Sequence, residues 1–493
     1  MKASNLTTSI SFFLNAQHIK VAVSPETTAL GLIRNELGKR GTKESCSEGD
    51  CGACTIAAGE LSDGKLNYRA INSCLWPAIR LHGKHIITIE GLSQGEELNL
   101  IQEQMLEHHA TQCGYCTPGI IMSLFCLFTR KQSPNKQDIV QALEGNLCRC
   151  TGYQPILSAA QSITELLIGK KHTNANHILP GYVSEIESKL VSHSEPIKVI
   201  ETNAFQGRDI HGYYVPRTLE ELHTCMDKFG DPERYRIVSG GTDLMVDINI
   251  NRNFPENIID ISEIDDLSAI RIKQDSISIG SGVTLTSIIE HPGIREKLPI
   301  LRETLLLVGS EQIRNMATLA GNIANASPIA DGVVALLGLD ADVTLLSKNG
   351  RRNVKLSDFF IDYKQTDLQT GEILGEIHIP IQEGFFNFEK SSKRQAVDIA
   401  TVNSFCYLKE DSGLISDCRF VFGGMDKTVR LAESCRPVVQ GKKLDDRLIL
   451  KCAEAAVKEF EPISDVRGSA DYRRQLVENH IVKHLHKFLS INE

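Results

Sequence analysis

The sequence predicts a multidomain α+β chain, and three observations support this. Its 493 residues exceed what one hydrophobic core usually organises, so about three units are expected. Nine of the fourteen cysteines lie within residues 46–150, which sets this part apart chemically. The hydrophobic pattern also changes along the chain, from paired strands to helices and then to strands mixed with helices. We therefore expect several domains with different chemistry.

The overall composition excludes some classes of protein. With 41% hydrophobic and 23% charged residues the chain resembles ordinary globular proteins. A net charge of −9 argues against non-specific nucleic-acid binding, which needs clustered Lys and Arg. No apolar run reaches the roughly 20 residues of a membrane span, and the apolar run at residues 10–14 is too short for a signal peptide. We expect no nucleic-acid or membrane partner, a cytoplasmic location and no disulfides.

The first domain, expected at residues 1–90, begins with strand signals. Two partly alternating apolar runs, Ser9–Leu14 and residues 19–23, flank a short polar turn and predict a hairpin. Thr27 or Thr28 then caps an amphipathic helix that a glycine ends. Two strands and a helix ahead of a cysteine-rich loop indicate a small ferredoxin-like sheet domain.

The first cysteine cluster has a specific spacing. It reads Cys46-x4-Cys51-x2-Cys54, with Cys74 following after a gap of nineteen residues. This is the plant-type spacing in which four thiolates hold a [2Fe–2S] cluster. Gly49, Gly52 and Ala53 are small enough for a backbone that wraps tightly around such a cluster. A zinc site fits poorly, because zinc sites favour two C-x2-C pairs.

The second domain, expected at residues 91–168, is helical. Ser133 reads as an N-cap with Pro134 at the first helical position, and residues 156–167 form another apolar-periodic helix. We expect a bundle of about four helices. Residues 169–208 then lose periodicity and become polar, which predicts a linker.

Four further cysteines form two pairs within the helical domain. The pairs are Cys113-x2-Cys116 and Cys148-x1-Cys150, separated by thirty-one residues. On spacing alone they could bind either an iron–sulfur cluster or zinc, although a C-x1-C pair is unusual for zinc. The adjacent plant-type motif favours a second redox centre. Cys126 and the five cysteines beyond residue 200 read as ordinary core or surface thiols.

The remainder of the chain predicts an α+β domain at residues 209–383 and a C-terminal α+β domain at residues 384–493. In the first, a strand runs into a glycine turn that could form an anion nest. The segment is Ile237, Val238, Ser239, Gly240, Gly241, Thr242, Asp243 and Leu244. A second stretch, residues 312–323, is rich in hydroxyl, amide and glycine residues, which suit a polar ligand held against the backbone; taken alone, it is more simply a polar loop. In the C-terminal domain, residues 402–408 and 417–422 read as strands and helices begin at Leu448 and Tyr472.

Two motifs carry a family resemblance. Residues 112–119 (QCGYCTPG) and 145–153 (GNLCRCTGY) resemble the second iron–sulfur domain of the molybdenum hydroxylases, the xanthine dehydrogenase family. The resemblance implies a ferredoxin-like β-grasp domain followed by a four-helix domain, with a [2Fe–2S] cluster in each. It also implies that Gln112 and Cys150 approach the pterin of a molybdenum cofactor across a domain or subunit boundary.

The glycine turn and the polar stretch resemble the FAD-binding domain of the same family, which has the vanillyl-alcohol-oxidase type of fold. The resemblance implies that residues 237–244 cradle the FAD diphosphate. It further implies flavin-binding roles for Thr318, Gly321, Asn322, Asp331, Leu374 and Lys390. Tyr363 matches a residue near the nicotinamide in the members that use NAD⁺.

The order of domains implies a function. No segment resembles the family's molybdenum domain, so we expect substrate oxidation on a large partner subunit and no catalytic residue in this chain. The fused order resembles the small subunits of bacterial xanthine dehydrogenases. This implies that electrons from hypoxanthine or xanthine, oxidised to urate, pass through both clusters to FAD and then to NAD⁺. A hetero-oligomer such as a dimer of heterodimers is expected.

Three alternatives stay open on the sequence. The chain could serve a molybdenum hydroxylase that acts on an aldehyde or an N-heterocycle. It could be an iron–sulfur flavoprotein reductase that needs no molybdenum partner. It could also be a zinc-binding scaffold without redox activity.

Overall fold

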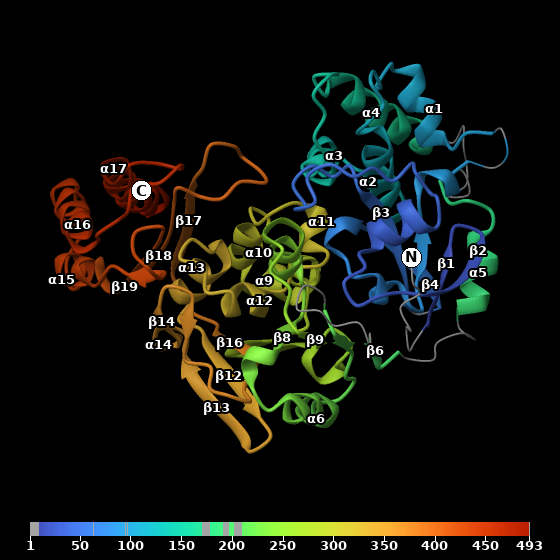
Figure 1. Cartoon of the computed structure of the whole chain (residues 1–493). Coiled ribbons are helices and arrows are strands. Elements are labelled where there is room, and N and C mark those ends of the chain that lie inside the picture. Colours follow the sequence, from blue (N-terminus) through green and yellow to red (C-terminus); the bar gives the residue numbers. More distant parts are fainter. Residues whose placement is uncertain are drawn as a thin grey trace. The chain divides into compact units, whose positions relative to one another are not determined.

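The computed structural model describes residues 9–62, 64–93, 95, 97–169, 178–190, 197–201 and 210–492. The chain forms two compact units (Figure 1). The first comprises Met1–Arg217, Lys228–Glu263 and Ser310–Met316, and the second comprises Thr218–Asp227, Ile264–Gly309 and Ala317–Glu493. Each unit contains both sheets and helices, which confirms the predicted α+β class.

A five-stranded sheet opens the first unit. Its order is β2-β1-β5-β3-β4, with β1 Ser9–Leu14, β2 Gln17–Ala22, β3 Thr55–Ser62, β4 Lys65–Asn72 and β5 His85–Ile87. The predicted hairpin is confirmed, because β1 pairs antiparallel with β2 and Leu14 lies opposite Gln17. The predicted cap is also present: the Thr28 hydroxyl accepts a hydrogen bond from the N–H of Gly31, at 3.0 Å, where a short helix (Gly31–Glu36) begins.

Four helices follow, as the sequence predicts. They are α1 Leu100–Glu107, α2 Thr117–Arg130, α3 Lys136–Leu143 and α4 Gln154–Ile168. The most apolar of them, α2, is buried along most of its length and lies against β3 and β4 of the sheet. The predicted start of α3 is wrong. Asn135, and not Ser133, is the N-cap, because its side chain accepts from the N–H of Asp138 while the Asp138 carboxylate accepts from the N–H of Asn135.

The predicted linker at 169–208 is only partly visible. Residues 170–177, 191–196 and 202–208 lie outside the described residues, as does the predicted domain start at residue 209. Between them the structure has a helix, α5 (Val183–Leu190), and a strand, β6 (Val199–Glu201). Val183, Ile186 and Leu190 are spaced as on one face of a helix and are all buried, which explains α5. The sequence predicts no helix here, because the residues between these three are mostly polar.

A second, four-stranded sheet completes the first unit. Its order is β6-β7-β9-β8, with β7 Gly212–Tyr214, β8 Tyr235–Val238 and β9 Asn257–Asp260, accompanied by α7 Thr242–Val246 and α11 Glu311–Arg314. One hydrophobic core joins the two sheets of this unit. It includes Ile33 and Trp76 beside the first sheet, Met245 in α7 and Ile258 in the second sheet. The ferredoxin-like domain therefore packs as one body with the part of the chain that holds the glycine turn.

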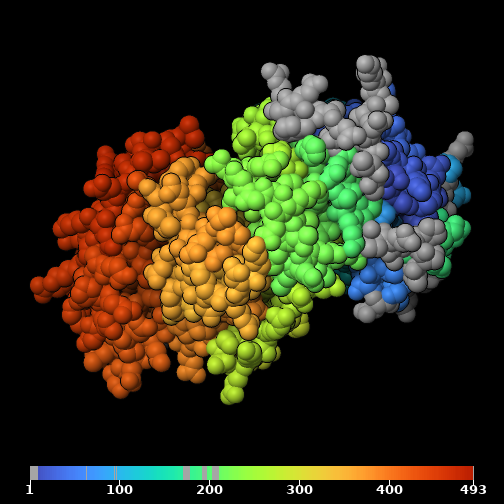
Figure 2. Space-filling view, turned by 60° about the horizontal axis from the view of Figure 1, so that its bottom comes forward, coloured from blue at the N-terminus to red at the C-terminus, as the bar shows by residue number. Residues whose placement is uncertain are grey.

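The second unit has two larger sheets and a hairpin. The orders are β10-β11-β16-β12-β13, β17-β18-β19-β20 and β14-β15. The strands are β10 Ile270–Ile272, β11 Ser276–Gly280, β12 Asp342–Ser347, β13 Gly350–Lys355, β14 Phe360–Asp362, β15 Gln365–Thr366, β16 Ile373–Pro380, β17 Phe385–Ser391, β18 Val402–Asp411, β19 Leu414–Gly423 and β20 Arg430–Leu431. In Figure 2 the orange surface of this unit adjoins the red surface of its C-terminal helices.

The helices of the second unit are mostly short. They are α6 Leu219–Phe229 (its last two residues belong to the first unit), α8 Leu285–Glu290, α9 Pro292–Lys297, α10 Pro299–Leu305, α12 Leu319–Ala324, α13 Asp331–Gly338, α14 Leu356–Phe359, α15 Arg436–Val439, α16 Asp446–Glu459 and α17 Ala470–Asn492. The strands and helices predicted for the C-terminal domain are all present, and each extends beyond its predicted range. In the part of the chain that the structure describes, no helix combines the length and the apolar character of a membrane span.

Helix α17 carries two buried histidines that hydrogen-bond to β18. The Ser404 hydroxyl lies 2.8 Å from His480 Nδ1 and 2.7 Å from His484 Nε2, and the Ser391 hydroxyl lies 2.8 Å from His480 Nε2. Burial lowers the pKa of His480 to about 4. The helix is therefore docked through neutral imidazole rings.

We expect this arrangement to weaken the protein in acid. In the unfolded chain His480 becomes protonated below pH 6.5, whereas in the folded chain it stays neutral down to about pH 4. Between these pH values the unfolded state binds more protons, so the free energy of unfolding falls as the pH drops. The loss from this one group is about 3 kcal/mol. Urea unfolding of the wild type and of His480→Gln at several pH values measures this loss. The free energy of unfolding should depend less steeply on pH in the variant than in the wild type. The exposed His486→Gln on the same helix is the control, and equal slopes in all three proteins would contradict the expectation.

Candidate functional site

The loop that carries Cys46, Cys51 and Cys54 lies over Cys74. Positive φ angles at Gly49 (+87°) and Gly52 (+66°) allow it to turn back on itself, as the small residues there predict. The Cys54 and Cys74 sulfurs lie 3.3 Å apart, and a hydrogen bond joins Cys46 to Cys51. That hydrogen bond lowers the pKa of the Cys51 thiol to about 6. The four predicted ligands therefore come together as two pairs.

A residue far along the chain holds this loop in place. The Asn249 side-chain amide donates to the Ser47 carbonyl at 3.0 Å and to the Cys74 carbonyl at 2.8 Å. It thus joins the two segments that carry the cysteines. The sequence offered no signal for this role, because an asparagine two hundred residues away belongs to no local motif.

The second set of cysteines lies at helix ends in the helical domain. Cys113 and Cys150 have their sulfurs 3.6 Å apart and are exposed, whereas Cys116 hydrogen-bonds to the buried Cys148. Burial, with help from Cys148, raises the pKa of Cys116 to about 12. The N–H of Cys148 donates to the Tyr153 hydroxyl at 2.9 Å, which fixes the turn between Cys148 and Cys150. The two segments enclose a cavity of about 140 Å³.

Both sets suit a two-iron cluster. Each iron of a [2Fe–2S] cluster takes two thiolates, so four ligands arranged as two pairs suit it. In the described ranges no three His, Cys, Asp or Glu side chains form a group that could hold one metal ion. Cys126, by contrast, is fully buried within α2 away from either set, as predicted.

The two cysteine loops touch each other. The N–H of Leu147, next to Cys148, donates to the Cys51 carbonyl at 3.0 Å, and the Asn146 side-chain amide donates to the Gly52 carbonyl at 3.1 Å. A Cβ on Gly52 would lie only 2.3 Å from the Gly145 carbonyl oxygen. Only glycine fits here, so this close approach sets the distance between the two candidate clusters.

The polar stretch 312–323 divides between the two units. Its first part contacts the helical domain. The buried Gln312 amide donates to Ser123 at 2.9 Å and to Asn146 at 3.0 Å. The buried Arg314 pairs with Glu144. Neither residue is among those named for the flavin. Their polar character serves packing against the helical domain.

The glycine turn predicted to hold a diphosphate lies in the first unit. Ile237 and Val238 end strand β8, Ser239 to Gly241 form the turn, and Thr242 to Leu244 begin α7. Gly241 has a φ of +83°, and a Cβ there would lie 3.3 Å from a Val238 methyl group. Gly240 and Gly241 carry no side chain at this bend, so a phosphate can come close to the backbone there.

The other predicted flavin residues lie in the second unit. Lys390 and Asp331, both buried, form an ion pair of 2.7 Å, and Asn403 donates to the other Asp331 oxygen at 2.6 Å. Thr318 caps α12 by accepting from the N–H of Gly321 at 3.0 Å. Leu374 is buried in the hydrophobic core on β16.

Asn322 provides a test of whether a ligand fits this part. Its side-chain oxygen is buried and has no hydrogen-bond partner, and a Cβ on Gly332 would lie 2.9 Å from it. A buried unpaired carbonyl oxygen is costly unless a ligand donates to it. Asn322 therefore suits a flavin, which carries an N–H donor.

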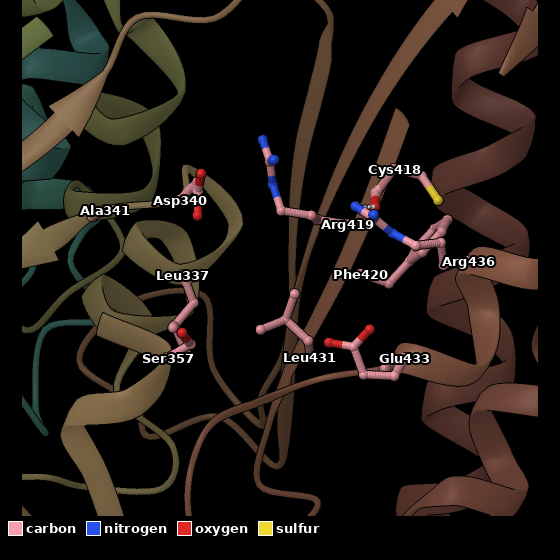
Figure 3. A pocket seen from close by; sticks show the side chains of 11 residues that line it. Leu337, Asp340, Ala341, Ser357, Cys418, Arg419, Phe420, Leu431, Glu433 and Arg436 are labelled. Carbon is pink, nitrogen blue, oxygen red and sulfur yellow. Dashed lines mark hydrogen bonds between the residues drawn. The ribbon is translucent and has the colours of Figure 1, made fainter. Parts of the chain in front are cut away.

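A polar pocket of about 320 Å³ also lies in the second unit (Figure 3). Leu337, Asp340 and Ser357 lie on one side of it, opposite Arg419 and Arg436. Both arginines are paired with Asp417, at 3.5 Å and 2.7 Å. One carboxylate is thus shared by the two arginines, and none of the predicted site residues lines this pocket.

Four family models match the chain in succession. Residues 12–78 match a 2Fe-2S iron-sulfur cluster binding domain, and residues 88–161 match a [2Fe-2S] binding domain. Residues 203–382 match the FAD binding domain in molybdopterin dehydrogenase, and residues 388–488 match the CO dehydrogenase flavoprotein C-terminal domain. The chain thus contains two [2Fe–2S] domains and an FAD-binding domain.

Curated relatives match almost the whole chain. A xanthine dehydrogenase from Emericella nidulans is 29% identical over 98% of this chain, and one from Drosophila subobscura is 30% identical over 97%. Aldehyde oxidase 1 from Bos taurus is 29% identical over 96%. In each case the match covers 39% of the relative, so the chain spans about two fifths of the length of these proteins.

Solved structures match a little over half of the chain. A carbon monoxide dehydrogenase from Hydrogenophaga pseudoflava and quinoline 2-oxidoreductase from Pseudomonas putida 86 each have a chain with a TM-score of 0.53 and 27% identity. In both cases the match covers 56% of this chain and 95% of the other.

Proposed function

Because the chain is built from the iron–sulfur and FAD domains of the molybdenum hydroxylases, we propose that it is the electron-transfer subunit of such an enzyme. The observation that carries the proposal is the arrangement of eight cysteines as two sets of two pairs. Cys46, Cys51, Cys54 and Cys74 would hold one [2Fe–2S] cluster, and Cys113, Cys116, Cys148 and Cys150 would hold the other.

For FAD we propose the residues named from the sequence, in each unit taken by itself. In the first unit, the turn at residues 237–244 would receive a diphosphate. In the second unit, Asn322 would accept a hydrogen bond from a flavin through its unpaired oxygen. The paired Asp331 and Lys390 would present a polar, nearly neutral surface. Thr318, Gly321 and Leu374 would contribute backbone and apolar contacts, as the resemblance implies.

The combination of groups suits an electron relay. Iron–sulfur clusters exchange one electron at a time, whereas a flavin exchanges one or two, so the pair can connect a molybdenum site to a two-electron acceptor. We propose a large cytoplasmic molybdenum subunit as the partner and NAD⁺ as the acceptor. The exposed Gln112 and Cys150 would face that partner, and the half-exposed Tyr363 would lie near the nicotinamide.

Xanthine is the substrate that we propose for the assembled enzyme, oxidised to urate on the partner subunit. The alignment of 97–98% of this chain with xanthine dehydrogenases supports this choice. The similarity to aldehyde oxidase 1, and of just over half of the chain to carbon monoxide dehydrogenase and quinoline 2-oxidoreductase, supports a second candidate: a molybdenum hydroxylase acting on another substrate.

Purification of the chain with its natural partners tests the proposal. We expect about four irons and one FAD per chain, and two distinct cluster signals in the EPR spectrum after reduction. A molybdenum-containing large subunit should co-purify, and xanthine should reduce the clusters. Zinc in place of iron would favour the zinc-binding scaffold. Iron and flavin without a molybdenum subunit would favour the independent reductase. Reduction of the clusters by an aldehyde or by another N-heterocycle, but not by xanthine, would show that xanthine is not the substrate.

A further inference from the structure

An arginine of the ferredoxin-like domain binds the carbonyl side of the glycine turn. Arg80 lies in a short helix (Ala78–Leu81), six residues after Cys74. Its Nη2 donates to the Ser239 carbonyl at 2.5 Å, and its Nη1 donates to the Gly240 carbonyl at 3.0 Å. All these residues belong to the first unit. One guanidinium group therefore binds two successive carbonyls of the turn.

The guanidinium is itself fixed by a buried carboxylate. Arg80 Nε and Nη2 donate to the two oxygens of Asp260, at 2.6 Å and 2.8 Å, and the Tyr213 hydroxyl donates to Asp260 at 2.6 Å. The side chain of Asp260 is only 1% exposed. Burial alone would raise the pKa of Asp260, but Arg80 lowers it below the ordinary value, so the pair stays charged. The fork of Arg80 has little freedom to turn away.

Peptide geometry turns this contact into an orientation of the N–H groups. In a planar trans peptide the carbonyl and the following N–H point in opposite directions. Since the Ser239 and Gly240 carbonyls point toward Arg80, the N–H groups of Gly240 and Gly241 point to the opposite side of the turn. Two successive N–H groups on one side form the donor set of an anion nest.

We propose that Arg80 is a positioning residue for the FAD diphosphate. It holds the turn in the conformation that presents the Gly240 and Gly241 N–H groups to phosphate oxygens, without touching the FAD itself. This inference rests on the proposed FAD site at residues 237–244. It makes a residue of the iron–sulfur domain part of the flavin site, a connection that no local sequence motif reveals.

FAD affinity of the flavin-depleted protein tests the inference. Lysine keeps the charge beside Asp260, but its single nitrogen cannot reach the carboxylate and both carbonyls at once. We expect Arg80→Lys to weaken FAD binding by roughly ten- to a hundredfold, measured by flavin fluorescence titration. Both cluster EPR signals and the melting temperature should stay close to those of the wild type.

Two further variants keep the test decisive. Arg234→Lys is the matched control, because Arg234 pairs at 2.6 Å with Glu256 on the surface just before β8 and touches no turn carbonyl; its FAD affinity should be unchanged. Arg80→Met combined with Asp260→Asn removes both buried charges, so it loosens the turn without leaving an unpaired carboxylate. Wild-type FAD affinity in Arg80→Lys or in this double variant would overturn the inference. A wild-type protein that binds no FAD would instead overturn the proposed function.

Discussion

Replacing Cys51 by alanine should remove half of the protein's iron. The variant lacks one of the four thiolates of the first set, so we expect about two irons per chain in place of about four, and the loss of one EPR signal while the other persists. Reduction of FAD by substrate through the partner subunit should fall by at least about a hundredfold, because the relay would lose one member. Iron analysis, EPR and stopped-flow absorbance measure the three effects.

Cys126→Ala is the matched control for this experiment. Cys126 lies fully buried in α2 of the helical domain and belongs to neither set of pairs, so its replacement should leave the iron content at the wild-type value. The proposed ligand sets would be wrong if Cys51→Ala retained all its iron, or if Cys126→Ala lost a cluster.

The second large effect is expected at Gly52. Its φ of +66° disfavours any other residue by roughly 1–2 kcal/mol, and an added Cβ would meet the Gly145 carbonyl at 2.3 Å and the Asn146 amide at 2.5 Å. Overpacking of this kind costs about another 1–3 kcal/mol. We expect Gly52→Ala to lower the free energy of unfolding by about 3–4 kcal/mol and to shift both EPR signals, because the two cysteine loops would move apart.

Gly64→Ala separates the two causes. Gly64 has a comparable φ of +76°, but nothing lies within 4 Å of its would-be Cβ. This variant should therefore show the backbone strain alone, about 1–2 kcal/mol, with both EPR signals unchanged. Urea unfolding of both variants gives the comparison. Equal destabilisation of the two would mean that the contact between the loops contributes nothing.

Local patterns predicted the local features of this protein. The spacing of eight cysteines predicted two sets of ligands, and the structure brings each set together as two pairs. The strand followed by Ser239, Gly240 and Gly241 predicted a glycine turn, and the turn is present after β8. In each case the chemistry depends on residues that are close in sequence, which a pattern can display.

Local sequence patterns do not predict the long-range contacts of this protein. Asn249 and Arg80 act on segments more than 150 residues away, and each belongs to a stretch with an unremarkable pattern. The contacts of Gln312 and Arg314 with the helical domain have no local signal either, because a polar stretch looks the same whether it faces a ligand or a neighbouring helix. Helix α5 was missed because its three buried positions stand among polar neighbours.

The pairing of Arg314 with Glu144 limits how this protein can be divided. A chain shortened to its two iron–sulfur domains would lack Arg314, leaving a carboxylate that is 10% exposed without its cation. It would also leave Arg80 without Asp260, so two buried charges of opposite sign would lose their partners at once. The iron–sulfur domains therefore cannot be excised or exchanged by cutting the chain directly after them. A stable transplant would also have to include the segments that contain Asp260 and Arg314.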